Sequence, residues 1–285
     1  MIIIGGSSSR DLAKDTASLL GCGYVQAFSM RFPDGECYVR VDRESLDDDV
    51  VIIQNTHPDA NIVELLLLQD AVRTLGARTI TTVVPYFGYA RQDRVFKPGE
   101  AESAKVMCDI IGRGCDRVLT VDIHKEDTLR HLSCRYRDLK AAGMIAGYFK
   151  GRSIDLVFAP DAGAAGRAKE VADALGVPHD HLEKTRLSAF EVRIAPSATS
   201  CEGKDVLIVD DMISTGSTIV AAKQALAEAG AKSVSVACTH GLFIGDALER
   251  LRGSSLDVVV CCNTIESSAS LISAAPIIAA ALREE

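Results

Sequence analysis

The segment Val206-Leu207-Ile208-Val209-Asp210-Asp211-Met212-Ile213-Ser214-Thr215-Gly216-Ser217-Thr218 decides the fold of this chain. Its first four residues are apolar and predict a buried strand, with two acidic residues at the carboxyl end of that strand. A turn of small polar residues follows, and a helical pattern then runs from Ser217 to Ala229, where Gly230 ends it. A strand, a polar turn and a helix in this order are typical of one unit of a parallel α/β sheet.

The same alternation of short apolar runs and helix-period segments extends along the whole chain. It predicts an α/β fold in which mostly parallel sheets are flanked by helices on both faces. The predicted strands are Ile2–Ile4, Val50–Gln54, Thr79–Val84, Arg117–Ile123, Asp155–Ala159, Asp205–Val209, Ser233–Thr239 and Asp257–Cys262. The predicted helices are Asp11–Leu20, Asn61–Leu75, Glu102–Ile111, Ala141–Phe149, Gly166–Leu175, Ser217–Ala229, Asp246–Leu251 and Ser270–Arg283.

A weak internal repeat indicates two similar α/β domains. Val84–Gly88 resembles Ala159–Gly163, because in both segments a strand ends in proline and glycine follows three positions later; Val118–Asp122 likewise resembles Val206–Asp210. Chance similarity between two common strand patterns is the alternative interpretation. We expect domains at 1–138 and 139–269, the final helix 270–285 packing on the first domain, and a flexible polar loop at 183–203 in the second.

The composition is that of an acidic globular protein. Of 285 residues, 47 % are hydrophobic and 25 % charged, and the net charge is −8. This balance argues against nucleic acid or an anionic membrane as a partner. No apolar run approaches the roughly 18 residues that a membrane span needs, and the amino terminus lacks the basic leader of a signal peptide. The nine cysteines include no C-x-x-C pair, so we expect reduced thiols and a cytoplasmic location.

The residues after the Val206 strand have the chemistry of a sugar-phosphate site. Asp210 and Asp211 can accept hydrogen bonds from neighbouring hydroxyls, such as those of a ribose. The turn from Ser214 to Thr218 offers backbone N–H groups, hydroxyls and the positive end of a helix, which suit a phosphate monoester. An ordinary strand-to-helix loop with an N-cap is the alternative. The segment is not a Walker A loop, because no Gly-Lys-Ser/Thr follows.

Residues Asp210–Thr218 resemble the phosphoribosyl-diphosphate-binding signature of type I phosphoribosyltransferases. Several other segments resemble ribose-phosphate diphosphokinases in particular, and in the same order along the chain. The most specific is Val84-Pro85-Tyr86-Phe87-Gly88-Tyr89-Ala90-Arg91-Gln92-Asp93-Arg94. The others are Gly5–Ser8, Phe32–Glu36, Val121–His124 and Pro160–Gly163, and the compact length and the residues around Lys184 resemble archaeal-type members.

This resemblance implies two domains of the type I phosphoribosyltransferase-like fold and a magnesium-dependent transfer of diphosphate from ATP to ribose 5-phosphate. Mg²⁺ is expected to number two per site, one of them arriving with ATP. The residues that match the family's catalytic pair are Lys184 and Arg186, and Arg186 is also expected to contact ribose 5-phosphate. A solvated loop with incidental charge is the alternative from residue chemistry alone. Thr185 separates the two cations here, whereas bacterial members have adjacent basic residues, which puts the spacing of Arg186 in doubt.

The resemblance also assigns the ATP site. A guanidinium suits the ATP phosphates and an amide suits the adenine edge or the ribose, and the matching residues are Arg91 and Gln92, with Asp93 in the same loop. The segment Phe32-Pro33-Asp34-Gly35-Glu36 matches the one that closes around adenine, from which Phe32, Asp34, Gly35 and Glu36 are expected to contribute. Pro-Asp-Gly is equally a strong turn signal, and we expect both interpretations to hold. In the family this segment often serves a neighbouring subunit, so a homo-oligomer is implied.

The resemblance assigns the metal to His124 and Asp161. Magnesium prefers oxygen ligands and usually retains several waters, so one imidazole and one carboxylate make a sparse site that substrate phosphates would complete. A structural histidine at a strand end is the alternative for His124. Two other functions stay open from the sequence: a phosphoribosyltransferase that consumes phosphoribosyl diphosphate, and a catalytically inactive regulatory relative.

Overall fold

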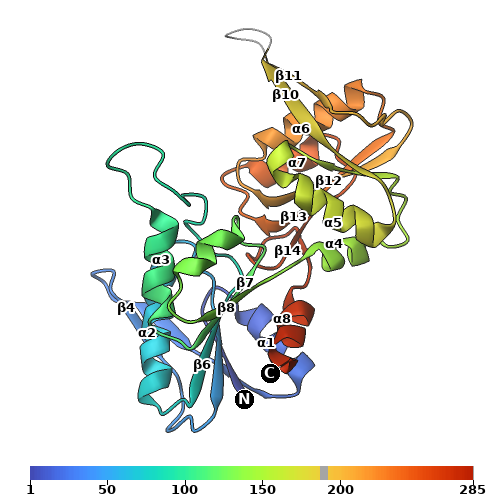
Figure 1. Ribbon diagram of the computed structural model, residues 1–285. Helices are drawn as coiled ribbons and strands as arrows, with labels where there is room; N and C mark the ends of the chain where they lie inside the picture. The colour runs from blue at the N-terminus through green and yellow to red at the C-terminus, as the bar shows by residue number, and fades with distance from the viewer. Residues whose placement is uncertain (187–191, 285) are drawn as a thin grey trace. The chain divides into compact units, whose positions relative to one another are not determined.

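The computed structural model describes the backbone of residues 1–186 and 192–284 (Figure 1). The chain forms two compact units. The first comprises Met1–Lys140, Thr264–Glu266 and Ser273–Glu285, and the second comprises Ala141–Asn263 and Ser267–Ile272. Each unit has its own sheet and its own hydrophobic core.

The first unit is built on a parallel sheet of six strands in the order β2-β1-β5-β6-β7-β8. In Figure 1, α2 and α3 lie on one side of this sheet and α1 and α8 on the other. The strands are β1 (Ile2–Gly5), β2 (Gly23–Gln26), β5 (Asp49–Ile53), β6 (Thr79–Val84), β7 (Arg117–Val121) and β8 (Arg135–Leu139). The helices are α1 (Arg10–Leu20), α2 (Ala60–Thr74), α3 (Ser103–Gly112), α8 (Ala275–Arg283) and a 3-10 turn, η1 (Glu126–His131).

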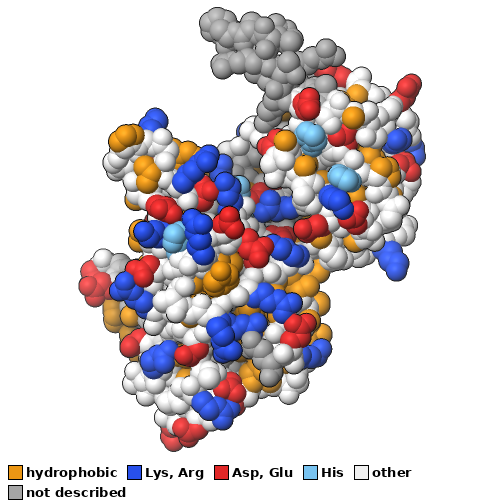
Figure 2. All heavy atoms as spheres, viewed as in Figure 1, with side chains coloured by type: hydrophobic (Ala, Val, Ile, Leu, Met, Phe, Trp, Pro, Cys, Tyr) orange, Lys and Arg blue, Asp and Glu red, His pale blue; other side chains and the backbone are white. Residues whose placement is uncertain are grey.

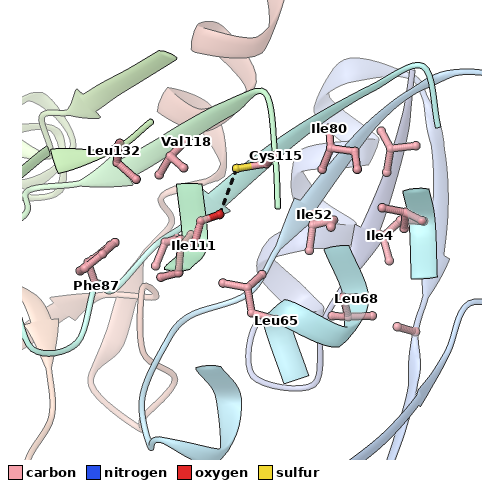
Figure 3. Close-up of a cluster of buried hydrophobic side chains, with 14 of the residues drawn as sticks. Ile4, Ile52, Leu65, Leu68, Ile80, Phe87, Ile111, Cys115, Val118 and Leu132 are labelled. Atoms are coloured by element: carbon pink, nitrogen blue, oxygen red, sulfur yellow. Dashed lines mark hydrogen bonds between the residues drawn. The ribbon is translucent and has the colours of Figure 1, made fainter. Parts of the chain in front are cut away.

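The core of this unit lies between the sheet and the helices α2 and α3 (Figure 3). Ile52 and Ile80 from neighbouring strands are fully buried, as are Leu65 of α2 and Ile111 of α3. Cys115 lies among them, and its thiol is 3.5 Å from the carbonyl oxygen of Ile111. All nine cysteines of the chain are free thiols, as the absence of a disulfide pattern predicts.

A small hairpin joins β2 to β5. Its strands, β3 (Phe28–Arg31) and β4 (Cys37–Arg40), pair antiparallel. The Pro-Asp-Gly signal forms the turn between them, where Gly35 has a φ of 94° and donates to the carbonyl of Phe32 over 2.9 Å. The turn was predicted, but the strands were not, because at four residues each they are too short for the alternation of apolar and polar residues to stand out.

The second unit has a seven-stranded sheet in the order β11-β10-β9-β12-β13-β14-β15, parallel except for the antiparallel edge pair β10–β11. Its strands are β9 (Leu156–Ala159), β10 (His179–Arg186), β11 (Val192–Pro196), β12 (Asp205–Ile213), β13 (Ser233–Gly241), β14 (Val259–Cys262) and β15 (Ser270–Ile272). The helices are α4 (Ala142–Phe149), α5 (Ala165–Leu175), α6 (Ser217–Glu228), α7 (Ala247–Gly253) and a 3-10 turn, η2 (Ala162–Ala164).

The two sheets share one connectivity. In each, the first strand along the chain is interior, the next pairs on one side of it, and a series of later parallel strands continues on the other side; in the second sheet β11 also extends the sheet beyond β10. β1 therefore corresponds to β9 and β5 to β12. Two similar domains were therefore predicted correctly. The sequence repeat that suggested them was displaced by two positions in the strand order of the first sheet, because it aligned β6 with β9 and β7 with β12. Ligands of such sheets bind where the strand order reverses, which in the second unit is between β9 and β12.

Two predicted segments differ from the structure. The helix predicted over 270–285 is wrong at its start: Ser270–Ile272 is strand β15, and α8 begins only at Ala275, with a proline in its first turn, and packs against α1. The loop predicted over 183–203 is also wrong in part, because β10 extends to Arg186 and β11 covers Val192–Pro196. The three strands β10, β11 and β15 form by pairing with a neighbour, and none of them has a long apolar run that would signal a strand by itself.

No helix in the described ranges, 1–186 and 192–284, is long and apolar enough to cross a membrane. On the face of the first unit shown in Figure 2, basic and acidic side chains are interspersed.

Candidate functional site

The two aspartates of the acidic segment lie within β12, not after it. The strand was predicted to end at Val209, but it continues to Ile213, and Asp210 is in register with Cys238 of β13. On its other side β12 pairs with β9 only as far as Ile208. Asp210 and Asp211 therefore lie on the part of β12 that extends past β9, at the reversal of strand order where a ligand is expected.

The environment of this pair favours one shared proton in the absence of ligand. Burial, and then the charge of Asp211, raise the pKa of Asp210 to about 8. Asp211 is 5 % exposed, and its carboxylate is 3.7 Å from the guanidinium of Arg167 on α5. An ionised Asp211 beside a protonated Asp210 is the arrangement that burial and this ion pair favour. A ligand that donates hydroxyl groups to the pair would favour its full ionisation.

The turn after β12 offers unpaired backbone donors. Within the described part of the chain, the backbone N–H groups of Ser214, Thr215 and Gly216 donate no hydrogen bond. Gly216 has a φ of 75°, and the helix α6 that follows has no side-chain cap at its N-terminus. The hydroxyls of Thr215 and Ser217 are 3.1 Å apart, and both side chains are exposed, as is that of Thr218. Consecutive free N–H groups at a helix N-terminus bind anions, phosphate among them.

Asp161 and His124, the predicted metal ligands, lie in different units. Asp161 follows β9, and both of its hydrogen bonds, from the N–H groups of Gly163 and Ala164, end on Oδ1 at 2.9 and 3.3 Å. The structure groups no three potential metal ligands among the described residues. The chemistry of Asp161 fits Mg²⁺, whereas the imidazole of His124 is a donor that Mg²⁺ does not prefer.

The predicted ATP residues Arg91, Gln92 and Asp93 are consecutive and lie in the loop after β6. Gln92 donates its amide to the Glu100 carboxylate over 3.3 Å. The ammonium of Lys125 is 2.8 Å from Asp93 and lowers the pKa of that carboxyl group by hydrogen bonding. These contacts fix the middle of the loop, while the side chain of Arg91 is exposed to solvent.

Thr56 holds the start of this loop through two hydrogen bonds of its hydroxyl group. Its hydroxyl donates to the carbonyl of Tyr86 over 3.2 Å and accepts from the N–H of Gly88 over 2.7 Å. A Cβ on Gly88 would lie 3.0 Å from the carbonyl oxygen of Thr56, and Tyr89 follows with a φ of 67°. The glycine is therefore needed for close approach, and a buried threonine outside the recognised motif shapes the predicted ATP segment.

The predicted adenine segment is the turn of the β3–β4 hairpin. Phe32 is 42 % exposed, and its ring centroid is 5.9 Å from that of Tyr38. The Asp34 carboxylate accepts from the N–H of Glu36 over 3.1 Å. The turn presents an aromatic face and two carboxylates to solvent.

Lys184 and Arg186, the predicted catalytic cations, are placed by backbone pairing alone. Lys184 is in register with Ile194 and Arg186 with Val192, so both belong to the β10–β11 hairpin. In Figure 1 this hairpin extends away from the rest of the second unit's sheet. The side chains of residues 184–195 lie outside what the structure describes.

Two family models match the chain: residues 1–113 match the N-terminal domain of ribose phosphate pyrophosphokinase, and residues 137–269 match the phosphoribosyl transferase domain. A ribose-phosphate pyrophosphokinase of Methanosarcina acetivorans is 41 % identical over 285 residues, covering 99 % of both chains. One of Thermococcus kodakarensis is 43 % identical over 278 residues, covering 97 % of this chain and 98 % of the relative.

The chain belongs to the ribose-phosphate pyrophosphokinase family. A crystal structure of phosphoribosylpyrophosphate synthetase from Mycobacterium smegmatis matches it with a TM-score of 0.88 and 28 % identity, covering 99 % of this chain and 97 % of that one. The family predicted from the sequence is therefore confirmed, and the enzyme is a transferase. Full-length coverage of the archaeal relatives also agrees with the archaeal-type resemblance.

A buried carboxylate that the sequence did not point to anchors the β10–β11 hairpin, which carries the predicted catalytic residues. Asp180, in β10, is 8 % exposed and accepts from the hydroxyl of Ser197 and the N–H groups of Ala198 and Thr199 at 2.5, 3.0 and 2.7 Å. Burial alone would raise the pKa of Asp180, but these hydrogen bonds outweigh it and lower the pKa to about 2. The Ser and Thr residues after β11 were the available signal, since such residues often pair with a nearby acid.

Replacing Asp180 with alanine is expected to destabilise the second unit by about 2 kcal/mol at pH 7, because three backbone donors, those of His181, Ala198 and Thr199, lose their acceptor. The pKa in the fold lies below the unfolded value of 3.8. The contribution is therefore complete above pH 4 and is lost as the pH falls toward 2. Thermal unfolding at pH 7 and pH 3 measures it. Asp173→Ala is the matched control, because Asp173 forms only a surface pair with Lys169. An equal loss of stability at both pH values would contradict the role of the charge.

Proposed function

We propose that this enzyme transfers the diphosphate of ATP to the anomeric hydroxyl of D-ribose 5-phosphate, giving 5-phospho-α-D-ribose 1-diphosphate and AMP for nucleotide biosynthesis. The arrangement at the end of β12 carries the proposal. It combines two carboxylates suited to sugar hydroxyls with three consecutive unpaired backbone N–H groups suited to a phosphate. A phosphate monoester of a pentose has both of these groups.

The donor is assigned to the first unit. The loop after β6 presents the Arg91 guanidinium for the ATP phosphates, and the amide of Gln92 and carboxylate of Asp93 for the nucleoside. The exposed ring of Phe32 is suited to stacking on adenine, and Asp34 and Glu36 to its amino group or ribose. A phosphoribosyltransferase that consumes phosphoribosyl diphosphate needs no such ATP segment, which favours the diphosphokinase.

In the transfer, the anomeric oxygen of ribose 5-phosphate forms a bond to the β-phosphorus of ATP and loses its proton. The bond between the β-phosphorus and the oxygen it shares with the α-phosphate breaks, so AMP leaves with that oxygen and its electron pair. Catalysis of this kind consists of positioning and of neutralising charge on the phosphate oxygens. Lys184 and Arg186 are the cations assigned to that neutralisation.

Mg²⁺ would be held by Asp161, together with the phosphates and water, and would supply further positive charge at the transferring diphosphate. Asp161 keeps one carboxylate oxygen clear of its own N–H donors, both of which bond Oδ1. The resemblance assigns His124 to the metal as well, although imidazole nitrogen is not a preferred Mg²⁺ ligand.

A direct assay of AMP formation from ATP and ribose 5-phosphate tests the function. AMP and phosphoribosyl diphosphate are expected in equal amounts, dependent on both substrates and on Mg²⁺. AMP without ribose 5-phosphate would indicate a nucleotide hydrolase. Consumption of added phosphoribosyl diphosphate with a nucleobase would indicate a phosphoribosyltransferase, and no turnover with retained ATP binding would indicate a regulatory relative.

We also propose a homo-oligomer and a cytoplasmic location. The β3–β4 hairpin exposes four large apolar side chains, and such clusters are typical of protein interfaces. They are Phe28, Met30, Phe32 and Tyr38. Analytical ultracentrifugation that finds only monomers at micromolar concentration would rule the oligomer out. The nine free thiols agree with a reducing compartment.

A further inference from the structure

Three consecutive carbonyl groups of the phosphate-binding turn are held from one side. The carbonyl of Ile213 accepts from the N–H groups of Leu242 and Phe243 at 3.0 and 3.1 Å. The carbonyl of Ser214 accepts from Ile244 at 3.0 Å. The carbonyl of Thr215 is held differently, because its partner is a side chain: Nη2 of Arg250, on α7, donates to it over 2.5 Å.

These anchors determine where the amide groups of the turn point. In a planar trans peptide the C=O of one residue and the N–H of the next point in opposite directions. Carbonyls held toward the segment Leu242–Arg250 therefore direct the N–H groups of Ser214, Thr215 and Gly216 away from it. Those are the three N–H groups that donate to no described residue. The last of them, on Gly216, depends on the hydrogen bond from Arg250.

The turn also lacks a cation of its own. Asp210–Ala222 contains two aspartates and no lysine or arginine. A phosphate dianion bound beside two carboxylates needs positive charge nearby, and the helix N-terminus supplies only about half an elementary charge. Arg250 brings a guanidinium to the turn, with Asp246 3.5 Å from its Nη1 as a partial counter-charge. Leu251, the next residue, packs beneath Gly216, where a Cβ would lie 3.2 Å from its side chain.

We infer that Arg250 is a positioning residue for the acceptor sugar phosphate: its bond to the Thr215 carbonyl aims the Gly216 N–H at the phosphate, and its charge favours the bound dianion. The inference rests on the proposed function, because it takes the turn to be the site of the 5-phosphate. Arg250 acts through the turn and is assigned no contact with the reacting atoms.

The same helix provides a matched control. Arg252 lies two residues further along α7 and donates its Nη2 to the carbonyl of Ser268 over 3.1 Å, in the connection between β14 and β15. Both arginines bond a carbonyl from an exposed position, but only Arg250 bonds the phosphate-binding turn. Because the Arg250 side chain is 51 % exposed, its replacement creates no buried cavity.

The test compares Arg250→Met, Arg250→Lys and Arg252→Met in two measurements: calorimetric binding of ribose 5-phosphate without ATP, and the KM of each substrate in the AMP assay. Arg250→Met is expected to weaken ribose 5-phosphate binding and raise its KM by about tenfold, with the KM for ATP within twofold of the unmodified enzyme. Arg250→Lys should recover part of the loss through its charge, and Arg252→Met should behave as the unmodified enzyme.

Two results would overturn the inference: ribose 5-phosphate binding by Arg250→Met within twofold of the unmodified enzyme, or an equal loss for Arg250→Met and Arg252→Met. A parallel rise in both KM values would also overturn it, since it would show a general disturbance of the fold. The proposed function fails separately, if the unmodified enzyme releases no AMP; the calorimetric comparison still decides the role of Arg250 in that case.

Discussion

Lys184→Ala is expected to lower kcat for AMP formation by about a thousandfold, the effect of removing one preorganised group that stabilises charge in a transition state. The charge that develops on the equatorial oxygens of the transferring diphosphate exists mainly in the transition state, so KM for both substrates should change by much less than kcat. Lys184→Arg should recover only part of the rate, because a planar guanidinium does not replace a compact ammonium.

Steady-state kinetics with thermal unfolding in parallel separates this loss of catalysis from loss of the fold. Glu183→Ala is the matched control, since Glu183 precedes Lys184 on β10, is exposed, and has no assigned role. Turnover of Lys184→Ala within tenfold of the unmodified enzyme would show that Lys184 is not the catalytic cation. Equal losses for Glu183→Ala and Lys184→Ala would mean that the hairpin, rather than the ammonium, is what matters.

The predictable parts of the fold are the elements whose own residues form a recognisable hydrophobic pattern. Val206–Val209 and the other short apolar runs bounded by turn residues form the buried strands of the two mostly parallel sheets. The edge strands β8 and β11 were missed, because both form by pairing with a neighbour: the residues of β8 are largely polar, and β11 lies within the stretch 183–203 that was interpreted as a loop. The misplaced start of the last helix has the same cause: β15 exists by pairing with β14.

The candidate site divides in the same way. Asp210, Asp211 and the turn after them are contiguous in the sequence, so the chemistry of this part of the site could be predicted from the sequence alone. The roles of Asp180 and Arg250 could not be predicted, since each residue bonds a segment that is distant in the sequence. Asp180 bonds residues after β11, and Arg250 bonds a turn 35 positions earlier. Thr56 is a third case, 32 positions before the Gly88 that it holds. Contacts of this kind depend on tertiary packing, and local periodicity gives no sign of them.

Asp210→Ala is expected to raise the KM for ribose 5-phosphate by about a hundredfold, since hydrogen bonds from sugar hydroxyls to a charged acceptor are among the stronger ones. The KM for ATP should stay within threefold, because the residues proposed to bind ATP lie in the other unit. Asp257→Ala is the control: that carboxylate accepts from the N–H of Val234 at the amino edge of the same sheet, away from the turn. Equal weakening of both substrates would contradict the division of sites.

The pH dependence of the same binding tests the electrostatic origin of the effect. With the pKa of Asp210 raised to about 8, the site is protonated at neutral pH, and hydroxyl donors must displace that proton. Ribose 5-phosphate affinity should therefore increase from pH 6 to pH 8 and level off above. Ionisation of the substrate phosphate acts in the same direction, so the deciding variant is Asp211→Asn, which removes the neighbouring charge that raises the pKa of Asp210. Its affinity should level off at a lower pH than that of the unmodified enzyme; an unchanged profile would show that the charge of Asp211 does not contribute to the raised pKa of Asp210.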